Sequence, residues 1–195
     1  MSYPTLRLHP RKEESVLRFH PWIFSGAIAS FSAPVEDGDL VSVVDSKGRP
    51  LGTGHFGGGS IAVRLLSFDA EEVIDRAFYK RRLEAALRLR LSCDLVRPVG
   101  SSDSPNTTYR LVHGEGDSLP GLIIDIYDRT AVVQAHSLGM HQARQTIAEV
   151  LWEVFAEAGD PVLPLEGVYY KSETTLPTRD MRELASDGFL IGHTE

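Results

Sequence analysis

Five glycines fall within the short stretch 52–59, between two segments that have the composition of β-strands. Positions 40–44 are mostly apolar and β-branched, and positions 61–66 alternate so that one face of a strand points inward. Glycine permits sharp bends and the close approach of neighbouring backbones. Several short strands joined by such turns predict a small, partly closed β-barrel over residues 1–70.

The same glycines also match the spacing G-x-G-x-x-G, from Gly52 to Gly57. That pattern holds a pyrophosphate only where a strand precedes it and a helix begins directly after it. Here the next segment, 61–66, has the pattern of a strand. The glycines are therefore predicted to serve the backbone, and no dinucleotide or methyl-donor site is expected in this stretch.

The net charge of −7 is unevenly distributed. Residues 1–70 hold seven Lys or Arg and seven Asp or Glu, whereas residues 71–110 hold eight basic and six acidic residues. Residues 111–195 hold five basic and fourteen acidic residues. A polyanion is therefore expected to bind the first half of the chain.

The remainder of the chain has the pattern of an α+β domain. A helix with six basic residues is expected after the acidic pair Glu71 and Glu72, followed by a Ser-, Gly- and Pro-rich linker over 98–107. After a first candidate strand, the expected order is two paired strands, a helix and a further strand. The expected strands are 109–112, 122–127, 131–135 and 167–171, and the longest apolar stripe predicts a helix over 143–158 that stops at Gly159.

Two groups of residues offer alternative chemistry. His113, Glu115 and Asp117 occur at a period of two, which on a strand would point all three the same way, as a metal site or an acid–base site requires. The glycines between them favour a solvated strand end with turn-stabilising carboxylates. Cys93 has arginines but no histidine nearby, so we interpret it as a small apolar filler near a helix end.

The composition also bears on the compartment. No apolar run approaches the roughly 20 residues that a membrane span needs, and residues 1–14 lack the apolar centre of a signal peptide. A single cysteine cannot form an internal disulfide. A cytoplasmic protein without membrane contact is expected.

Cations and aromatic rings occur together near the N-terminus. Basic residues are frequent from Arg7 to His20, and Trp22 and Phe24 follow directly. Cations that neutralise phosphates, beside rings that stack on bases, are what recognition of single-stranded RNA requires. Alternatively, both rings lie in the core and the charges are merely solvated; composition alone does not separate the two.

Three motifs resemble the bacterial ribosomal RNA large-subunit methyltransferase I family. The segment His20-Pro21-Trp22-Ile23-Phe24-Ser25-Gly26-Ala27-Ile28 resembles the signature of that family's N-terminal PUA domain, as does Gly54-His55-Phe56 with Ile61 to Ser67. The run Asp117-Ser118-Leu119-Pro120-Gly121-Leu122-Ile123-Ile124-Asp125 resembles its central domain. The likeness extends over nearly the whole chain.

The resemblance implies an RNA-binding PUA-like pseudo-barrel and a small central α/β domain. In that family a further domain binds S-adenosylmethionine, and the enzyme methylates C5 of a cytosine in ribosomal RNA. We expect that domain, and with it the cofactor and any catalytic residue, to lie outside this chain. Whether the chain has enzyme activity of its own is left open.

The sequence thus predicts residues 1–70 as the PUA-like domain, 71–107 as a basic helix and linker, and 108–195 as the central domain. Ribosomal RNA and the absent methyltransferase domain are the expected partners, and a homodimer stays open. The alternatives are a stand-alone interaction module and a metal-dependent enzyme built on His113, Glu115 and Asp117. The predicted RNA-binding residues are Arg11, Lys12, Arg18, His20, Trp22, Ser25, Gly26 and Arg64.

Overall fold

The computed structural model describes residues 3–98, 105–177 and 186–193 and divides into two compact units, 1–74 and 75–195. The basic helix falls in the second unit, where its apolar stripe packs against a second helix. No helix in the described residues is long and apolar enough to cross a membrane. Each unit is described separately below.

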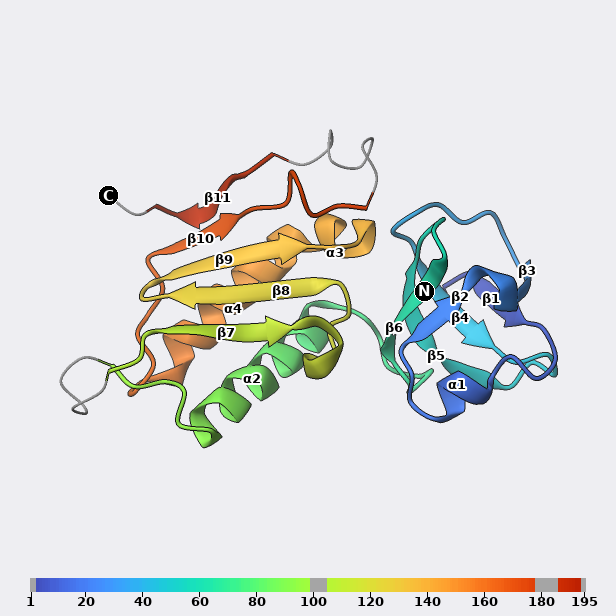
Figure 1. Ribbon diagram of the computed structural model, residues 1–195, viewed down its shortest axis with the longest axis horizontal. Coiled ribbons are helices and arrows are strands. Elements are labelled where there is room, and N and C mark those ends of the chain that lie inside the picture. The colour runs from blue at the N-terminus through green and yellow to red at the C-terminus, as the bar shows by residue number, and fades with distance from the viewer. Residues whose placement is uncertain (1–2, 99–104, 178–185, 194–195) are drawn as a thin grey trace. The chain divides into compact units, whose positions relative to one another are not determined.

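The first unit is a curled six-stranded sheet with one short helix (Figure 1). The sheet order is β2-β6-β5-β4-β1-β3, antiparallel except where β1 pairs with β4. The expected small barrel-like fold is confirmed. Its elements are β1 (Thr5–Leu8), α1 (Glu14–Leu17), β2 (Trp22–Phe24), the 3-10 turn η1 (Ser25–Ala27), β3 (Ile28–Phe31), β4 (Leu40–Val44), β5 (Pro50–Phe56) and β6 (Ile61–Ser67).

Alternation along the strands of the first unit builds its core. In β1 and β4 every second side chain is buried. The inward side chains are small and branched, as suits the short strands of a narrow barrel. The buried residues are Leu6, Leu8, Val16, Ile23, Val41, Val43, Val63 and Leu65.

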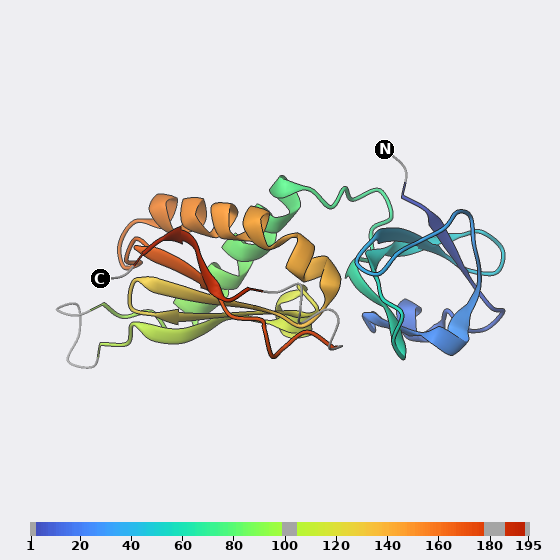
Figure 2. The ribbon, with the colours of Figure 1, turned by 90° about the horizontal axis from the view of Figure 1, so that it is seen from above.

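The second unit is a five-stranded sheet with helices on one face, as Figure 2 shows. The sheet order is β11-β10-β9-β8-β7, and β9 and β10 are parallel because the helices cross between them. The α+β class is therefore correct for this chain. The elements are α2 (Arg76–Ser92), β7 (Thr108–His113), the 3-10 turn η2 (Gly114–Asp117), β8 (Leu122–Tyr127), β9 (Thr130–Ala135), α3 (Leu138–Gln142), α4 (Arg144–Ala158), β10 (Gly167–Tyr170) and β11 (Gly188–Gly192).

The helices of the second unit begin and end at recognisable residues. The Asp75 carboxylate accepts a hydrogen bond from the Phe78 N–H, 2.9 Å away, so α2 begins at Arg76 and not at the acidic pair before it. Gly159, with a φ of 63°, ends α4 as predicted. The edge strand β11, which follows Ser186, was not among the expected strands. Its Phe189 contacts Tyr169 of β10 edge to face.

Candidate RNA interface

Strand β2 determines what faces solvent near the N-terminus. Ile23 is buried in the barrel core, whereas its neighbour Phe24 is 52% exposed and Trp22 is half-buried. Because side chains alternate along a strand, Ile23 points into the core and the rings of Trp22 and Phe24 both lie on the opposite face. The interpretation that puts both rings in the core is wrong.

His20, Trp22 and Arg64 form one cluster. Trp22 lies directly opposite Arg64 across the β2–β6 pair. The backbone N–H of Trp22 donates to Nδ1 of His20, 3.2 Å away. The two rings meet edge to face with centroids 5.6 Å apart. A cation and two rings from separate parts of the sequence thus lie side by side at one edge of the sheet.

Ser25 and Gly26 form the turn η1 at the other end of β2. The Ser25 N–H donates to the Ser60 carbonyl at 3.0 Å, which ties the turn to the loop before β6. Both residues are exposed. A Cβ on Gly26 would have no heavy atom within 4 Å, so the fold does not require glycine there.

Arg11 and Lys12 lie in the loop between β1 and α1. The His9 N–H at the start of this loop donates to the Ala27 carbonyl at 2.9 Å, which places the loop beside η1. Both cations are exposed, as is Arg18 after α1. Within the described residues none of the three forms an ion pair, so their charges are available to a ligand.

The predicted residues therefore surround α1 and β2, with the β6 residue Arg64 contributed from the neighbouring strand. Three exposed cations and a ring cluster lie in or beside the chain segment from Arg11 to Trp22. The acidic side chains of Glu13 and Glu14 lie in the same segment, so the local surplus of positive charge is only one. Charge alone does not define this surface.

The glycine-rich segment has the structural role that was predicted. A Cβ on Gly54 would lie 2.2 Å from the Arg64 carbonyl oxygen, and one on Gly52 would lie 2.3 Å from the Ser67 carbonyl oxygen. Strand β6 occupies the position where a nucleotide-binding fold would begin its helix. The segment therefore does not fit S-adenosylmethionine or a dinucleotide.

His55, between these glycines, is buried in the barrel wall. It is 6% exposed, and burial lowers its pKa to about 4. Its Nδ1 is buried without a hydrogen-bond partner. The ring is neutral near pH 7 and takes no part in the exposed cluster.

The His113, Glu115 and Asp117 group does not form a metal site. Glu115 and Asp117 lie on η2, so the period-two strand face does not exist. Among the residues that the structure describes, no group of three His, Cys, Asp or Glu side chains could hold a metal ion. This finding removes the support for a metal-dependent enzyme.

Asp117 instead anchors η2 to helix α2. Its carboxylate accepts two hydrogen bonds from the Arg90 guanidinium, and both side chains are nearly buried. It also accepts from the His113 N–H at 2.6 Å. The predicted solvated carboxylate is therefore a buried structural one, because its cationic partner lies 27 residues earlier in the chain.

Other cations of α2 are paired with the acidic helix α4. The Arg76 guanidinium binds the Glu153 carboxylate at 2.6 and 2.8 Å, and Lys80 binds Glu157 at 2.7 and 2.9 Å. Part of the acidic surplus of the second half is thus neutralised inside its own unit. These two cations are not available to a polyanion in the way that those around α1 are.

Cys93 does not fill the core. It caps the C-terminus of α2 and is exposed, so the interpretation as an apolar filler is wrong. The last turn of the helix closes there, where the Cys93 and Asp94 N–H groups donate to the Leu89 and Leu91 carbonyls. No histidine or other base is recorded as a partner of its thiol in the described residues.

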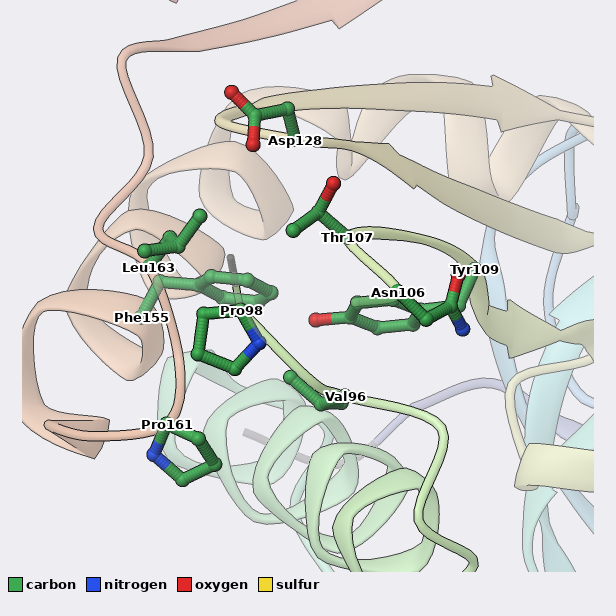
Figure 3. Close-up of a pocket in the computed structure, with 9 residues that line it drawn as sticks. All are labelled: Val96, Pro98, Asn106, Thr107, Tyr109, Asp128, Phe155, Pro161 and Leu163. Carbon is green, nitrogen blue, oxygen red and sulfur yellow. The ribbon is translucent and has the colours of Figure 1, made fainter. Parts of the chain in front are cut away.

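Figure 3 shows a small pocket of the second unit, between the linker and the end of α4. The Tyr109 hydroxyl points toward Pro98 and Phe155, and burial raises the pKa of Tyr109 to about 12. The volume of about 10 Å³ is close to the minimum for one water molecule. The pocket is too small for a nucleoside or a methyl donor.

One exposed ring was missed by sequence reasoning. Phe19 is 74% exposed and has a φ of 61°, in the left-handed region. A backbone angle of this kind leaves no mark on the sequence when the residue is not glycine or asparagine. The only available signal was a phenylalanine between Arg18 and His20, outside any apolar period.

Comparisons with known proteins agree with this architecture. Residues 6–68 match the protein family described as PUA-like domain, so the first unit is a PUA-like barrel. The resemblance of the chain to the bacterial ribosomal RNA large-subunit methyltransferase I family, expected from its motifs, is confirmed. A protein of that name from Klebsiella pneumoniae is 33% identical over 191 residues, which cover 97% of this chain and 44% of the relative.

A second relative of the same name, from Shewanella amazonensis, is 40% identical over 153 residues, which cover 78% of this chain and 37% of the relative. A solved structure from Streptococcus mutans, described as a candidate SAM-dependent methyltransferase, superposes with a TM-score of 0.73 at 18% identity. That match covers all of this chain and 44% of the other, and it shows a shared fold. The chain spans less than half the length of these proteins.

Proposed function

We propose that this chain is the RNA-binding N-terminal portion of a SAM-dependent methyltransferase that modifies C5 of a cytosine in ribosomal RNA. The single observation that carries the proposal is the exposed cluster around α1 and β2 of a PUA-like barrel. The exposed cations Arg11, Lys12 and Arg18 and the contacting rings of His20 and Trp22 all belong to the segment that contains α1 and the start of β2. Cations contact phosphates without regard to sequence, and the rings and η1 add recognition of shape.

The described residues of this chain hold and orient RNA and carry out no methyl transfer. Their glycine-rich segment is filled by the β6 backbone, and the pocket beside Tyr109 has room for about one water molecule. S-adenosylmethionine and the catalytic residues are assigned to the part of the relatives that this chain does not match. The second unit, with its acidic surplus, positions that part.

Charge reversal at the α1 loop tests the proposal. The double variant Arg11→Glu, Lys12→Glu should weaken binding of a ribosomal RNA fragment by about tenfold or more at 0.1 M salt, because two phosphate contacts become repulsive. The matched control is Lys47→Glu, Arg88→Glu, which changes the net charge equally at two exposed positions away from the cluster. Fluorescence anisotropy measures both. Equal affinities for the two double variants would refute this binding site.

A further inference from the structure

Phe19 combines a left-handed backbone with an exposed aromatic side chain. A bulky side chain in the left-handed region is a strained outlier, since glycine or asparagine is normally found there. The same side chain is 74% exposed, so little burial offsets the strain. The left-handed backbone closes the C-terminus of α1, where glycine is the usual residue, so the turn itself does not explain why an aromatic side chain is placed there.

The backbone around Phe19 is fixed. Its N–H donates to the Val16 carbonyl at 2.9 Å, and the next N–H, of His20, donates to the Ser15 carbonyl at 3.0 Å. Both acceptors belong to α1, which is held in the core by the buried Val16. The ring therefore projects from a closed turn and not from a free loop.

One contact anchors the ring to the barrel. Phe19 meets Phe68 edge to face, with centroids 5.3 Å apart, and Phe68 packs on the core of the first unit. Most of the Phe19 surface stays open to solvent. A pre-oriented, exposed aromatic ring is the geometry on which an unpaired base stacks.

The charges around the ring complement a nucleic-acid strand. Arg18 precedes Phe19 and is exposed, and the His20–Trp22 ring pair beside Arg64 follows it. Because Glu13 and Glu14 reduce the local surplus to one positive charge, attraction to phosphates alone gives weak binding. Stacking supplies the remaining affinity, and only unpaired bases expose their faces for it.

We infer that Phe19 is a stacking platform for an unpaired nucleobase, so that the first unit prefers single-stranded RNA over duplex RNA. The inference rests on the proposed function, because it takes RNA as the ligand. It adds the class of RNA and a contact residue that the predicted site did not include. Phe24, 52% exposed, is a second exposed ring of the first unit, on β2.

The experiment compares Phe19→Leu with Phe19→Tyr in the full 195-residue chain. Leucine keeps an apolar contact with Phe68 and the same backbone strain but has no ring, whereas tyrosine keeps the ring. The probes are a 12-nucleotide single-stranded oligoribonucleotide and the same strand in a perfect duplex. Fluorescence anisotropy gives the dissociation constants. Thermal unfolding checks that every variant is folded.

We expect Phe19→Leu to weaken single-strand binding by about tenfold and duplex binding by less than about twofold, with Phe19→Tyr close to the parent protein. Phe31 is an exposed ring on β3 that packs on Phe56. The control Phe31→Leu should change neither the single-strand nor the duplex dissociation constant. Phe19→Asn, which tolerates the left-handed backbone, replaces the leucine variant if that one unfolds.

Unchanged single-strand binding in a folded Phe19→Leu protein would overturn the stacking role while leaving RNA binding intact. Equal losses for single strand and duplex would show a structural effect and also contradict it. If the parent protein binds neither probe, the proposed function itself fails. The outcomes for the two proposals are therefore distinct.

Discussion

Gly54 lies where strands β5 and β6 approach most closely. A Cβ there would meet the Arg64 carbonyl oxygen at 2.2 Å and the Leu65 Cα at 2.7 Å, and neither backbone atom can move without breaking the strand pair. Gly54→Ala should therefore lower the free energy of unfolding of the first unit by about 2–4 kcal/mol. Chemical denaturation measures this, with Gly57→Ala as control.

Gly57 is a matched control because a Cβ there has no heavy atom within 4 Å. It lies three residues further along the same glycine-rich segment and should be near neutral. Equal effects of the two substitutions would contradict the account of the β5–β6 contact.

His55 makes the stability of the first unit depend on pH. Burial lowers its pKa from 6.5 to about 4, so the unfolded chain binds a proton that the folded one does not. The contribution of neutral His55 to the free energy of unfolding is fully present above pH 6.5. It is lost as the pH falls from 6.5 to 4, a decrease of about 3 kcal/mol. His55→Gln, which cannot take up the proton, should lack this slope.

Trp22 fluorescence in a Trp152→Phe background follows the first unit alone, because the other tryptophan lies in the second unit. Denaturant midpoints at pH 7, 5.5 and 4.5 give the slope for each protein. Parallel slopes for the parent and the glutamine variant would show that His55 is not the titrating group.

At the scale of elements, the Arg90–Asp117 pair connects η2 to α2. Both side chains are nearly buried, so Asp117→Ala leaves the arginine charge without a partner in a poorly solvated place. We expect a loss of about 3–5 kcal/mol in the second unit. Glu153→Ala, which breaks the exposed Arg76 pair between α2 and α4, should have a much smaller effect. Calorimetry distinguishes the two; similar losses would contradict the structural role of Asp117.

The elements show which features the sequence can predict. Local patterns were sufficient for β6, α4 and the end of α4 at Gly159, because alternation, helical periodicity and a left-handed glycine are properties of neighbouring residues. Strand β11 was missed because it is held by pairing with β10, some twenty residues earlier, and by contacts with α4, and neither gives a local sequence signal. The edge position of such a strand weakens its apolar signal.

In the candidate site, too, the sequence predicts contacts between neighbouring residues but not contacts between residues far apart in the chain. Proximity in sequence was enough to group His20 with Trp22, and the motif brought in Arg64, which the β2–β6 register then placed opposite Trp22. The pairing of Asp117 with Arg90 spans 27 residues and gives no local signal. The left-handed backbone of Phe19 is likewise a product of the turn after α1, so sequence reasoning could not single out that ring.

At the scale of the whole molecule, each unit has its own hydrophobic core. We therefore expect the fragment 1–74 to fold alone, with a Trp22 unfolding midpoint close to that in the full chain. Circular dichroism and fluorescence of the fragment measure this. A fragment without cooperative unfolding would show that the first unit needs the second, and RNA binding could not then be assigned to the barrel alone.

The central claim is that cations around α1 and β2 neutralise RNA phosphates. The most direct test is the salt dependence of binding of a single-stranded ribosomal RNA fragment to this chain. Four contacts, from Arg11, Lys12, Arg18 and Arg64, predict that the logarithm of the association constant falls against the logarithm of salt concentration with a slope of about −3. Replacing Arg11 and Lys12 by glutamine should bring the slope to about −1.5. A slope near zero, or one that the double substitution leaves unchanged, would contradict the account.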